Sequence, residues 1–301
     1  PAQEHIQLNE ETIWAGQPNN NPNPAALEYL PKIRDMVFAG QYIEAEQLAT
    51  EKVMSQTNSG MPYQSFGDLR LSFPGHSAYT DYYRELSLDS AIARVSYKVK
   101  GVEFQREVFT SFPDQVVMMR LTASKKKQIS FHALLTSPHQ DVKITTEENE
   151  ITLSGVTPTH ERLRGKVEFH GRVTAKIKGG KLTTRDGVLV VDKADEVVLM
   201  VSIATNFRDY KNIDIDEVAK AKDILSKAVD KDYNTSRRAH IDFYKQYYDR
   251  STLYLGDNKY KHLPTDKRVE QFATSNDNQL VATYYQFGRY LLICSSQPGG
   301  Q

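Results

Sequence analysis

The stretch ARVSYKVKGVEFQREV, residues 93–108, decides the fold class of this chain. Apolar and polar side chains alternate up to Val99 and again from Val102, which is the period-two pattern of strands with one buried face. Lys100-Gly101 separates the two runs, and a short reversal containing glycine is typical of a β-hairpin. The stretch therefore predicts two antiparallel strands that are neighbours in one sheet.

The same alternation extends on both sides of this hairpin, from about Gly67 to Thr205. Its longest run, Val167 to Ile177, ends at Gly179-Gly180. The last run, EVVLMVSIAT at residues 196–205, is apolar on both faces, which indicates a central strand. Many strands joined by short polar turns, without helices between them, favour a large antiparallel sandwich. The predicted fold class is mainly β.

Helical patterns bracket the strands. Residues 24–56 carry the proline and glycine signals of a helical excursion from the sandwich. After Thr205, Asp214 and Glu217 resemble a capping box ahead of an amphipathic helix, and a second helix is predicted around residues 237–251. The sequence STLYLG, residues 251–256, is predicted as a short strand.

The closing stretch, from Val281 to Ile293, is apolar or aromatic at nearly every position, with Gln286 and Arg289 as the main interruptions. A helix that is hydrophobic all round belongs in a larger helical core or in a membrane, and this one is too short to span a bilayer. We therefore expect its neighbours to lie outside this sequence, which would be the front part of a longer protein. Cys294 is predicted to be a buried structural thiol.

Composition excludes several classes of protein. The 38 Lys and Arg residues balance the 38 Asp and Glu residues, so there is no electrostatic case for binding nucleic acid or an anionic membrane. The single cysteine excludes an internal disulfide framework and a multi-cysteine metal site. The chain opens at Pro1 without a methionine, so the lack of a visible signal peptide carries no information.

General catalytic and metal-binding motifs are absent from the sequence. There is no P-loop, no G-x-S-x-G, no H-E-x-x-H and no paired C-x-x-C, and the eight histidines are scattered without ligand spacing. We therefore predict no metal site. Glu10 and Glu11 are adjacent carboxylates that could serve acid and base chemistry, but adjacent residues of a strand point to opposite faces, so we do not expect the pair to flank one bond.

Two segments stand out as candidates for ligand binding. In IQLNEETIWAGQPNNNPNP, residues 6–24, Trp14 lies among amides and acids, a combination that suits sugar recognition because the ring can stack on a pyranose while amides bond its hydroxyls. The alternative is that Trp14 packs between the sandwich and a helix. The second segment is LPTDKR, residues 263–268, which is also compatible with a surface linker.

Six blocks, in this order, resemble the N-terminal part of bacterial glycoside hydrolase family 95, the inverting 1,2-α-L-fucosidases and their α-L-galactosidase relatives. The resemblance covers essentially the whole chain. The blocks are AQEHIQLNEETIWAG, SFGDLRLSF, YRELSLDSAIARVSYKVKGVEFQREVFTSFPDQVVMMRLTA, ATNFRDYK, LPTDKR and YYQFGRYLLICSSQPGG.

The resemblance implies a domain plan. Residues 1–210 would form an N-terminal β-supersandwich, with the helical excursion at 24–56, and residues 211–262 a helical linker. Residues 263–301 would be the start of an (α/α)6 catalytic barrel, whose first helix is YYQFGRYLLICSS. The rest of the barrel would follow Gln301.

The resemblance also implies the chemistry. In the family, a glutamic acid protonates the leaving oxygen, and water is activated with the help of two asparagines and an aspartate, all of them in the barrel. We therefore expect the catalytic residues beyond Gln301, no catalytic residue in this segment, and no metal or organic cofactor. Trp14, Thr265, Asp266 and Arg268 are the candidates for substrate binding, because they would lie at or face the entry to the barrel.

The leading hypothesis is thus the N-terminal part of an exo-glycosidase that removes terminal α-L-fucose from host or plant glycans, in the periplasm or secreted. Its partners would be a fucosylated oligosaccharide and its own C-terminal barrel. Within the family, an α-L-galactosidase is the alternative. A carbohydrate-binding module and a purely structural sandwich are the alternatives from other classes.

Overall fold

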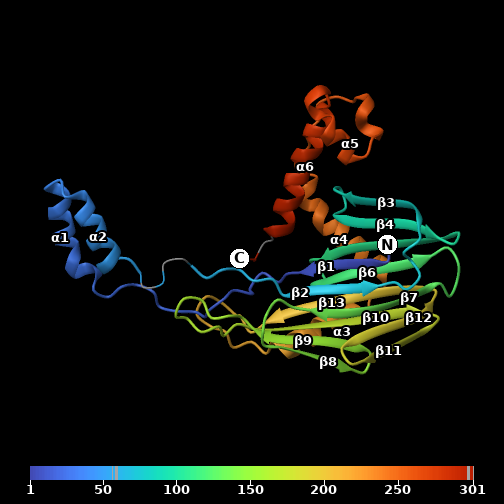
Figure 1. The fold of residues 1–301 in the computed structure, drawn as a ribbon, viewed down its shortest axis with the longest axis horizontal. Helices are drawn as coiled ribbons and strands as arrows, with labels where there is room; N and C mark the ends of the chain where they lie inside the picture. Colours follow the sequence, from blue (N-terminus) through green and yellow to red (C-terminus); the bar gives the residue numbers. More distant parts are fainter. Residues whose placement is uncertain (56, 58–59, 297–298, 301) are drawn as a thin grey trace.

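The computed structural model describes residues 1–55, 57, 60–296 and 299–300. Two antiparallel sheets form its body (Figure 1), which confirms the mainly β sandwich. The smaller sheet has five strands in the order β1-β2-β7-β12-β11. These strands are β1 (Gln3–Leu8), β2 (Gly67–Ser72), β7 (Ile129–Thr136), β11 (Lys181–Arg185) and β12 (Val188–Ala194).

The larger sheet has eight strands in the order β3-β4-β5-β6-β13-β10-β9-β8. They are β3 (Thr80–Ser87), β4 (Ile92–Val99), β5 (Val102–Ser111), β6 (Val116–Ala123), β8 (Val142–Glu147), β9 (Glu150–Val156), β10 (Glu168–Lys178) and β13 (Glu196–Thr205). β13 lies between β6 and β10, so the prediction of a central strand is confirmed.

The hairpin predicted from residues 93–108 is β4 and β5, with Tyr97 opposite Phe104 in the register. Lys100 and Gly101 both have positive φ, at 49° and 75°. This is the backbone of a two-residue turn whose twist matches that of the strands it joins. Sequence alternation and turn chemistry therefore specify the same hairpin.

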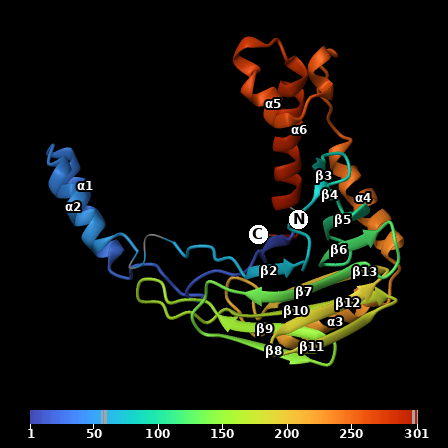
Figure 2. The same ribbon diagram turned by 45° about the vertical axis from the view of Figure 1, so that its right-hand side comes forward.

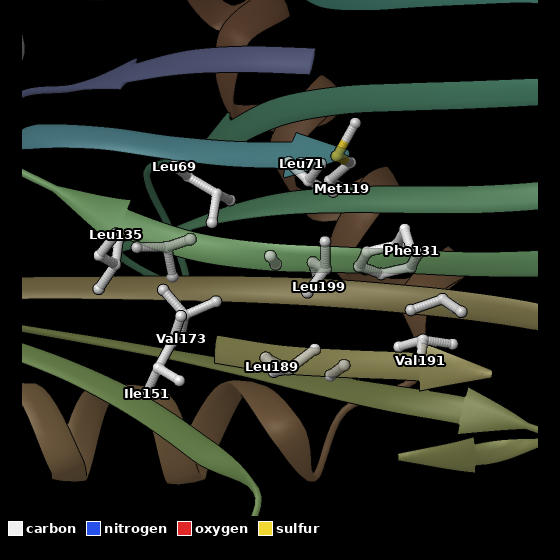
Figure 3. Packing of buried hydrophobic residues seen from close by; sticks show 14 of the residues in the cluster. Leu69, Leu71, Met119, Phe131, Leu135, Ile151, Val173, Leu189, Val191 and Leu199 are labelled. Carbon is white, nitrogen blue, oxygen red and sulfur yellow. The ribbon is translucent and has the colours of Figure 1, made fainter. Parts of the chain in front are cut away.

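The main core lies between the two sheets (Figure 3). Leu71, Phe131 and Leu135 come from the five-stranded sheet and pack with Leu199 and Val173 of the eight-stranded sheet. All five side chains are almost completely buried. Burial of apolar surface stabilises a fold by about 25 cal/mol per Å². Because this cluster is the largest group of buried apolar side chains among the described residues, it contributes most to the stability of the sandwich.

The helix α3 (Glu217–Val229) covers part of the outer face of the eight-stranded sheet, the face turned away from the five-stranded sheet. Leu225 and Ala228 pack there on Met200 and Val198, which explains why β13 is apolar on both faces. The N-cap of α3 is Asp216, whose side chain accepts from the Ala219 amide. The predicted cap at Asp214 is therefore wrong, because Asp214 instead pairs with Arg208 at 2.6 Å.

Residues 24–56 contain a helical hairpin, α1 (Ala26–Phe38) and α2 (Tyr42–Lys52). Figures 1 and 2 show this hairpin standing well away from the sandwich at the end of an extended segment. Pro31 lies inside α1, in its second turn, so the residues on both sides of it belong to one helix.

The C-terminal part is helical and rises from the sandwich (Figure 2). It contains α4 (Tyr233–Tyr248), η1 (Lys259–His262), α5 (Thr265–Glu270), η2 (Phe272–Thr274) and α6 (Asn278–Ser295). Residues 251–256 form no strand, so that prediction is wrong: the segment connects α4 to the α5–α6 region and joins neither sheet.

α6 exposes apolar side chains on most of its surface. Its buried residues are Leu280 and Ala282, whereas Tyr284 is 75% exposed and Leu292 is 64% exposed. Cys294 is also exposed, which corrects the prediction of a buried thiol. The reason is that the described residues pack against only one side of α6.

Candidate functional site

A cleft with a volume of about 790 Å³ lies among the described residues. It lies against the outer face of the eight-stranded sheet and is bounded by α3, α4, the segment after β1 and the chain beyond α6. Its polar and aromatic lining includes Asn9, Glu10, Glu11, Thr12, Gln115, Arg208, Asp209, Tyr210, Lys220, His240, Phe243 and Tyr244.

Glu10 is the best-defined carboxylate of this cleft. It accepts hydrogen bonds from the backbone amide and the hydroxyl of Thr12, both at 2.7 Å. The Thr12 hydroxyl lies 2.5 Å from that of Thr205 at the end of β13, which fixes the loop on the sheet. Burial raises the pKa of Glu10, and the hydrogen bonds from Thr12 oppose that shift. Glu10 therefore takes up a proton more readily than an exposed glutamate does.

Glu10 and Glu11 do not lie on a strand, because β1 ends at Leu8. The reason given from the sequence for separating the two side chains is therefore wrong, and both line the cleft.

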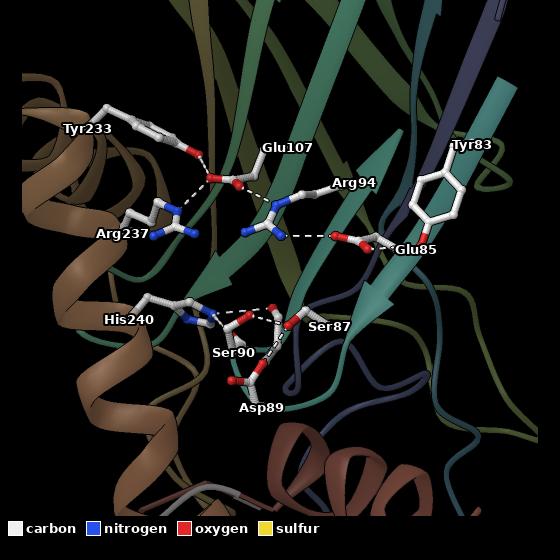
Figure 4. Close-up of polar contacts among 11 residues, drawn as sticks. Tyr83, Glu85, Ser87, Asp89, Ser90, Arg94, Glu107, Tyr233, Arg237 and His240 are labelled. Atoms are coloured by element: carbon white, nitrogen blue, oxygen red, sulfur yellow. Dashed lines mark hydrogen bonds and ion pairs between the residues drawn. The ribbon is translucent and has the colours of Figure 1, made fainter. Parts of the chain in front are cut away.

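His240 contributes to the cleft as an anchor. Its Nε2 lies 3.0 Å from the carbonyl oxygen of Ser90, and its ring stacks on Phe109 at 4.7 Å between centroids. Burial lowers the pKa of His240, so the imidazole is held neutral. Figure 4 shows that this contact ties α4 to the corner between β3 and β4.

Trp14 lies on the loop between β1 and α1, and its ring is 36% exposed. Its Nε1 donates to the carbonyl of Glu11 at 2.9 Å, and the ring meets Tyr63 edge-on at 5.4 Å. The Tyr63 hydroxyl in turn donates to the carbonyl of Glu10 at 3.0 Å. The indole is thus fixed by the loop that carries Glu10, with one part of its surface open.

The three candidates of the LPTDKR segment belong to α5. Thr265 and Asp266 are exposed at its start. Arg268 is buried and binds Asp277 with two hydrogen bonds, Nε to Oδ2 at 2.8 Å and Nη2 to Oδ1 at 2.9 Å. Asp277 is the N-cap of α6 and accepts from the Leu280 amide at 3.1 Å. The guanidinium of Arg268 therefore holds the N-cap residue of α6 in place and is not free to bind a substrate.

The structure does not bring the four candidates together. Figures 1 and 2 place α5 at the end of α6 remote from the sandwich. Trp14 instead follows β1, six residues after its last residue Leu8. Two sets of contacts were not predicted from the sequence. They are the hydrogen bonds that link Glu10, Thr12 and Thr205, and the ion pair between Arg268 and Asp277. The only local signal was the Glu-x-Thr spacing, because the partners Thr205 and Asp277 follow no helical or strand period.

The described residues contain no group of three His, Cys, Asp or Glu side chains that could hold a metal ion. None of their helices is both long enough and apolar enough to span a membrane.

The match of the two-sheet sandwich to a family model gives its class, the N-terminal domains of glycosyl hydrolases. The chain belongs to the family described as glycosyl hydrolase family 65, N-terminal domain, which matches residues 1–210. Residues 232–301 match the glycosyl hydrolase family 95 catalytic domain. With the relatives below, this second match confirms the resemblance to the N-terminal part of family 95.

Three curated relatives are similar over almost the entire chain. "Alpha-L-fucosidase 2" of Arabidopsis thaliana is 33% identical over 99% of this chain and 39% of its own length. "Probable alpha-fucosidase A" of Aspergillus niger is 27% identical over 98% of this chain and 39% of its own length. The protein of the same name from Aspergillus oryzae is 22% identical over 99% of this chain and 43% of its own length. The chain thus spans about two-fifths of each relative.

Proposed function

We propose that this chain is the N-terminal part of an exo-glycosidase that hydrolyses terminal α-L-fucosyl residues with inversion, and that its catalytic groups lie on a helical barrel following Gln301. One observation carries the proposal: α6 is apolar on nearly all sides, yet the described residues bury only Leu280 and Ala282 of it. A helix of this kind is stable in water only when other elements cover it.

The match of residues 232–301 to a catalytic domain supports this role for α6. On this proposal residues 1–210 are the sandwich, 211–262 the linker and 263–301 the entry to the barrel. Arg268 then acts by holding the first barrel helix through Asp277, while Thr265, Asp266 and Trp14 remain available to the substrate.

The direct test is hydrolysis of 2′-fucosyllactose by the 301-residue chain and, in parallel, by the longer protein that continues past Gln301. We expect turnover by the longer protein alone. Turnover by the 301-residue chain would contradict the placement of the catalytic groups. Proton NMR of the sugar first released distinguishes inversion from retention, because inversion of an α-fucoside releases β-L-fucose.

Substrate preference needs its own comparison. L-Galactose differs from L-fucose by one hydroxyl at C6, so a fucosidase pocket with an apolar contact at that position would favour the deoxy sugar. We propose fucose, as in the names of the relatives. Rates on matched p-nitrophenyl α-L-fucoside and α-L-galactoside test this, and a faster galactoside would reverse the assignment. We also propose a bacterial origin and a periplasmic or secreted location, which fractionation of the cells that produce the protein would test.

Trp14 is the residue through which the sandwich could contact the substrate, since it is about one-third exposed and its indole is held by a hydrogen bond. In the longer protein, Trp14→Phe should raise KM for the fucoside and leave the melting temperature nearly unchanged. A change in melting temperature with unaltered kinetic constants would show that Trp14 is only structural.

A further inference from the structure

A polar array covers the outer face of β3, β4, β5 and β6, away from the 790 Å³ cleft. Residues that are direct partners in the antiparallel register project from the same face of a sheet. One row across the four strands is Tyr83, Ser96, Gln105 and Thr122. The neighbouring row is Glu85, Arg94, Glu107 and Arg120. The array is therefore a neutral row beside a row of alternating charge.

All eight side chains line one cleft of about 220 Å³. This volume lies just below the roughly 300–1,000 Å³ of sites for drug-sized ligands, so it suits one small ring. The cleft has no histidine or cysteine among its lining residues.

The charged row is held rigidly by its own contacts (Figure 4). Arg94 binds Glu85 at 2.9 Å and Glu107 at 2.7 Å. Glu107 also accepts from the Tyr233 hydroxyl and from Arg237, both on α4. Although burial opposes it, these hydrogen bonds lower the pKa of Glu107. Of the other lining arginines, Arg106 is paired with Glu4 and Arg120 with Glu196. The charged side chains of the cleft are thus all engaged in ion pairs, and no unpaired charge is left to attract an anion or a cation.

The neutral row has free hydrogen-bonding capacity. Within the described residues, the hydroxyls of Ser96 and Thr122 have no hydrogen-bond partner. Each can donate one hydrogen bond and accept two. The buried Nε of Arg120 also has no partner in this part of the chain, and a buried N–H group calls for an acceptor. This wall of the cleft therefore offers donors and acceptors that no other described residue occupies.

Tyr83 supplies an aromatic surface at the end of the neutral row. It lies on β3, the edge strand of the sheet, and is 59% exposed. Its hydroxyl donates to Glu85 at 3.2 Å, which orients the ring beside the cleft (Figure 4). A tyrosine held in this way offers a flat apolar face at a low cost in conformational entropy.

We propose that this cleft is an accessory, non-catalytic site for one neutral sugar ring, which stacks on Tyr83 and hydrogen-bonds Ser96, Gln105 and Thr122. An uncharged, hydroxyl-rich ring satisfies both the aromatic edge and the neutral row. The site is independent of the proposed hydrolytic activity, because sugar binding there involves no reaction. Glu85 and Glu107 are each already bound to an arginine and to a tyrosine hydroxyl.

The test is saturation-transfer NMR and calorimetry on the 301-residue chain with the methyl glycosides of L-fucose, D-galactose and D-glucose, and with D-galacturonate as the charged probe. We expect saturable binding of at least one neutral sugar and no saturable binding of D-galacturonate. No binding of any neutral sugar, or equal binding of the acid, would overturn the proposal.

Three variants locate the bound sugar. Tyr83→Ala should weaken binding about three- to tenfold through the lost stacking, and Gln105→Ala by a similar factor. Tyr82→Ala is the matched control, since Tyr82 is a 48% exposed tyrosine of the same strand that does not line the cleft. Thermal melts establish that each variant is folded. Sugar binding that is insensitive to both cleft variants, or equally sensitive to Tyr82→Ala, would place the sugar elsewhere and refute the site.

Discussion

Arg268 and Asp277 form an ion pair, with Nε and Oδ2 2.8 Å apart and side chains that are only 8% and 1% exposed. The pair closes the turn between α5 and α6, and Asp277 also receives a hydrogen bond of 2.7 Å from Asn258. These contacts lower the pKa of Asp277 to about 2, chiefly through Arg268. The start of α6 is therefore fixed by an aspartate that stays ionised down to about pH 2.

Breaking this pair should release α6 from α5. Arg268→Ala leaves the Asp277 charge buried without its partner, which typically costs about 3–5 kcal/mol. We expect hydrogen–deuterium exchange of the first turns of α6 to accelerate accordingly, with little change in the strands. Asp277→Asn keeps a capping oxygen, so a smaller acceleration is expected. Unchanged exchange in Arg268→Ala would show that the pair contributes nothing to the helix.

The same pair predicts a pH dependence. Because the folded pKa of Asp277 is depressed, its contribution is fully present above the unfolded value near 3.8 and is lost as the pH falls through about 2. The difference in α6 protection between the unmodified chain and Asp277→Asn should therefore shrink between pH 4 and pH 2. A difference that stays constant over this range would contradict the ionic origin.

Arg289 joins α6 to α4. Its Nη1 donates to the carbonyls of Tyr248 and Ser251 at 2.7 and 2.6 Å, and its Nη2 to that of Tyr247 at 2.8 Å. The Tyr247 and Tyr248 carbonyls belong to the last turn of α4, where a cation also interacts favourably with the helix dipole, and Ser251 lies just beyond the helix. Arg289→Gln should cost about 2 kcal/mol in the docking of α6, measured by hydrogen exchange. Arg289→Lys keeps the positive charge but lacks the planar guanidinium. Its loss of docking free energy should therefore be smaller than that of Arg289→Gln, yet measurable against the unmodified chain.

Local patterns could predict the elements, but not their non-local partners. The hairpin of β4 and β5 follows from alternation and Lys100-Gly101, because both signals are local. The pairing of β6 with β13 could not be predicted, since alternation specifies a buried face and not a neighbour. Similarly, Arg268 could be selected as a candidate because it lies in a polar segment. Its partner Asp277 could not, because η2 lies between the two residues and their separation matches no helical or strand repeat. Asp216 replaced Asp214 as the cap because Arg208 engages Asp214.

Glu10 predicts a pH dependence of the opposite sign. Burial raises its pKa, so its contribution to stability is present below the unfolded value and is lost as the pH rises through the folded value. Glu10→Gln should remove this loss, making the variant relatively more stable above about pH 5 in urea unfolding. Glu11→Gln is the matched control, because it removes the same charge from an exposed neighbour. Parallel stability profiles for the unmodified chain and Glu10→Gln would contradict the effect of burial.

Gly171 and Gly288 should respond to the same substitution with opposite signs. A Cβ at Gly171 on β10 would lie 2.3 Å from Cζ of the fully buried Phe66, so Gly171→Ala must displace a core ring and should cost about 1–3 kcal/mol. Gly288 lies inside α6 with no atom within 4 Å of the added methyl, so Gly288→Ala should stabilise the helix by about 0.5–1 kcal/mol. Urea unfolding measures the first effect and exchange in α6 the second. Adding Phe66→Leu to Gly171→Ala should recover part of the loss, because the shorter side chain vacates the contact. If the double variant is less stable by the sum of the two single losses, Phe66 and Gly171 are not in the contact described.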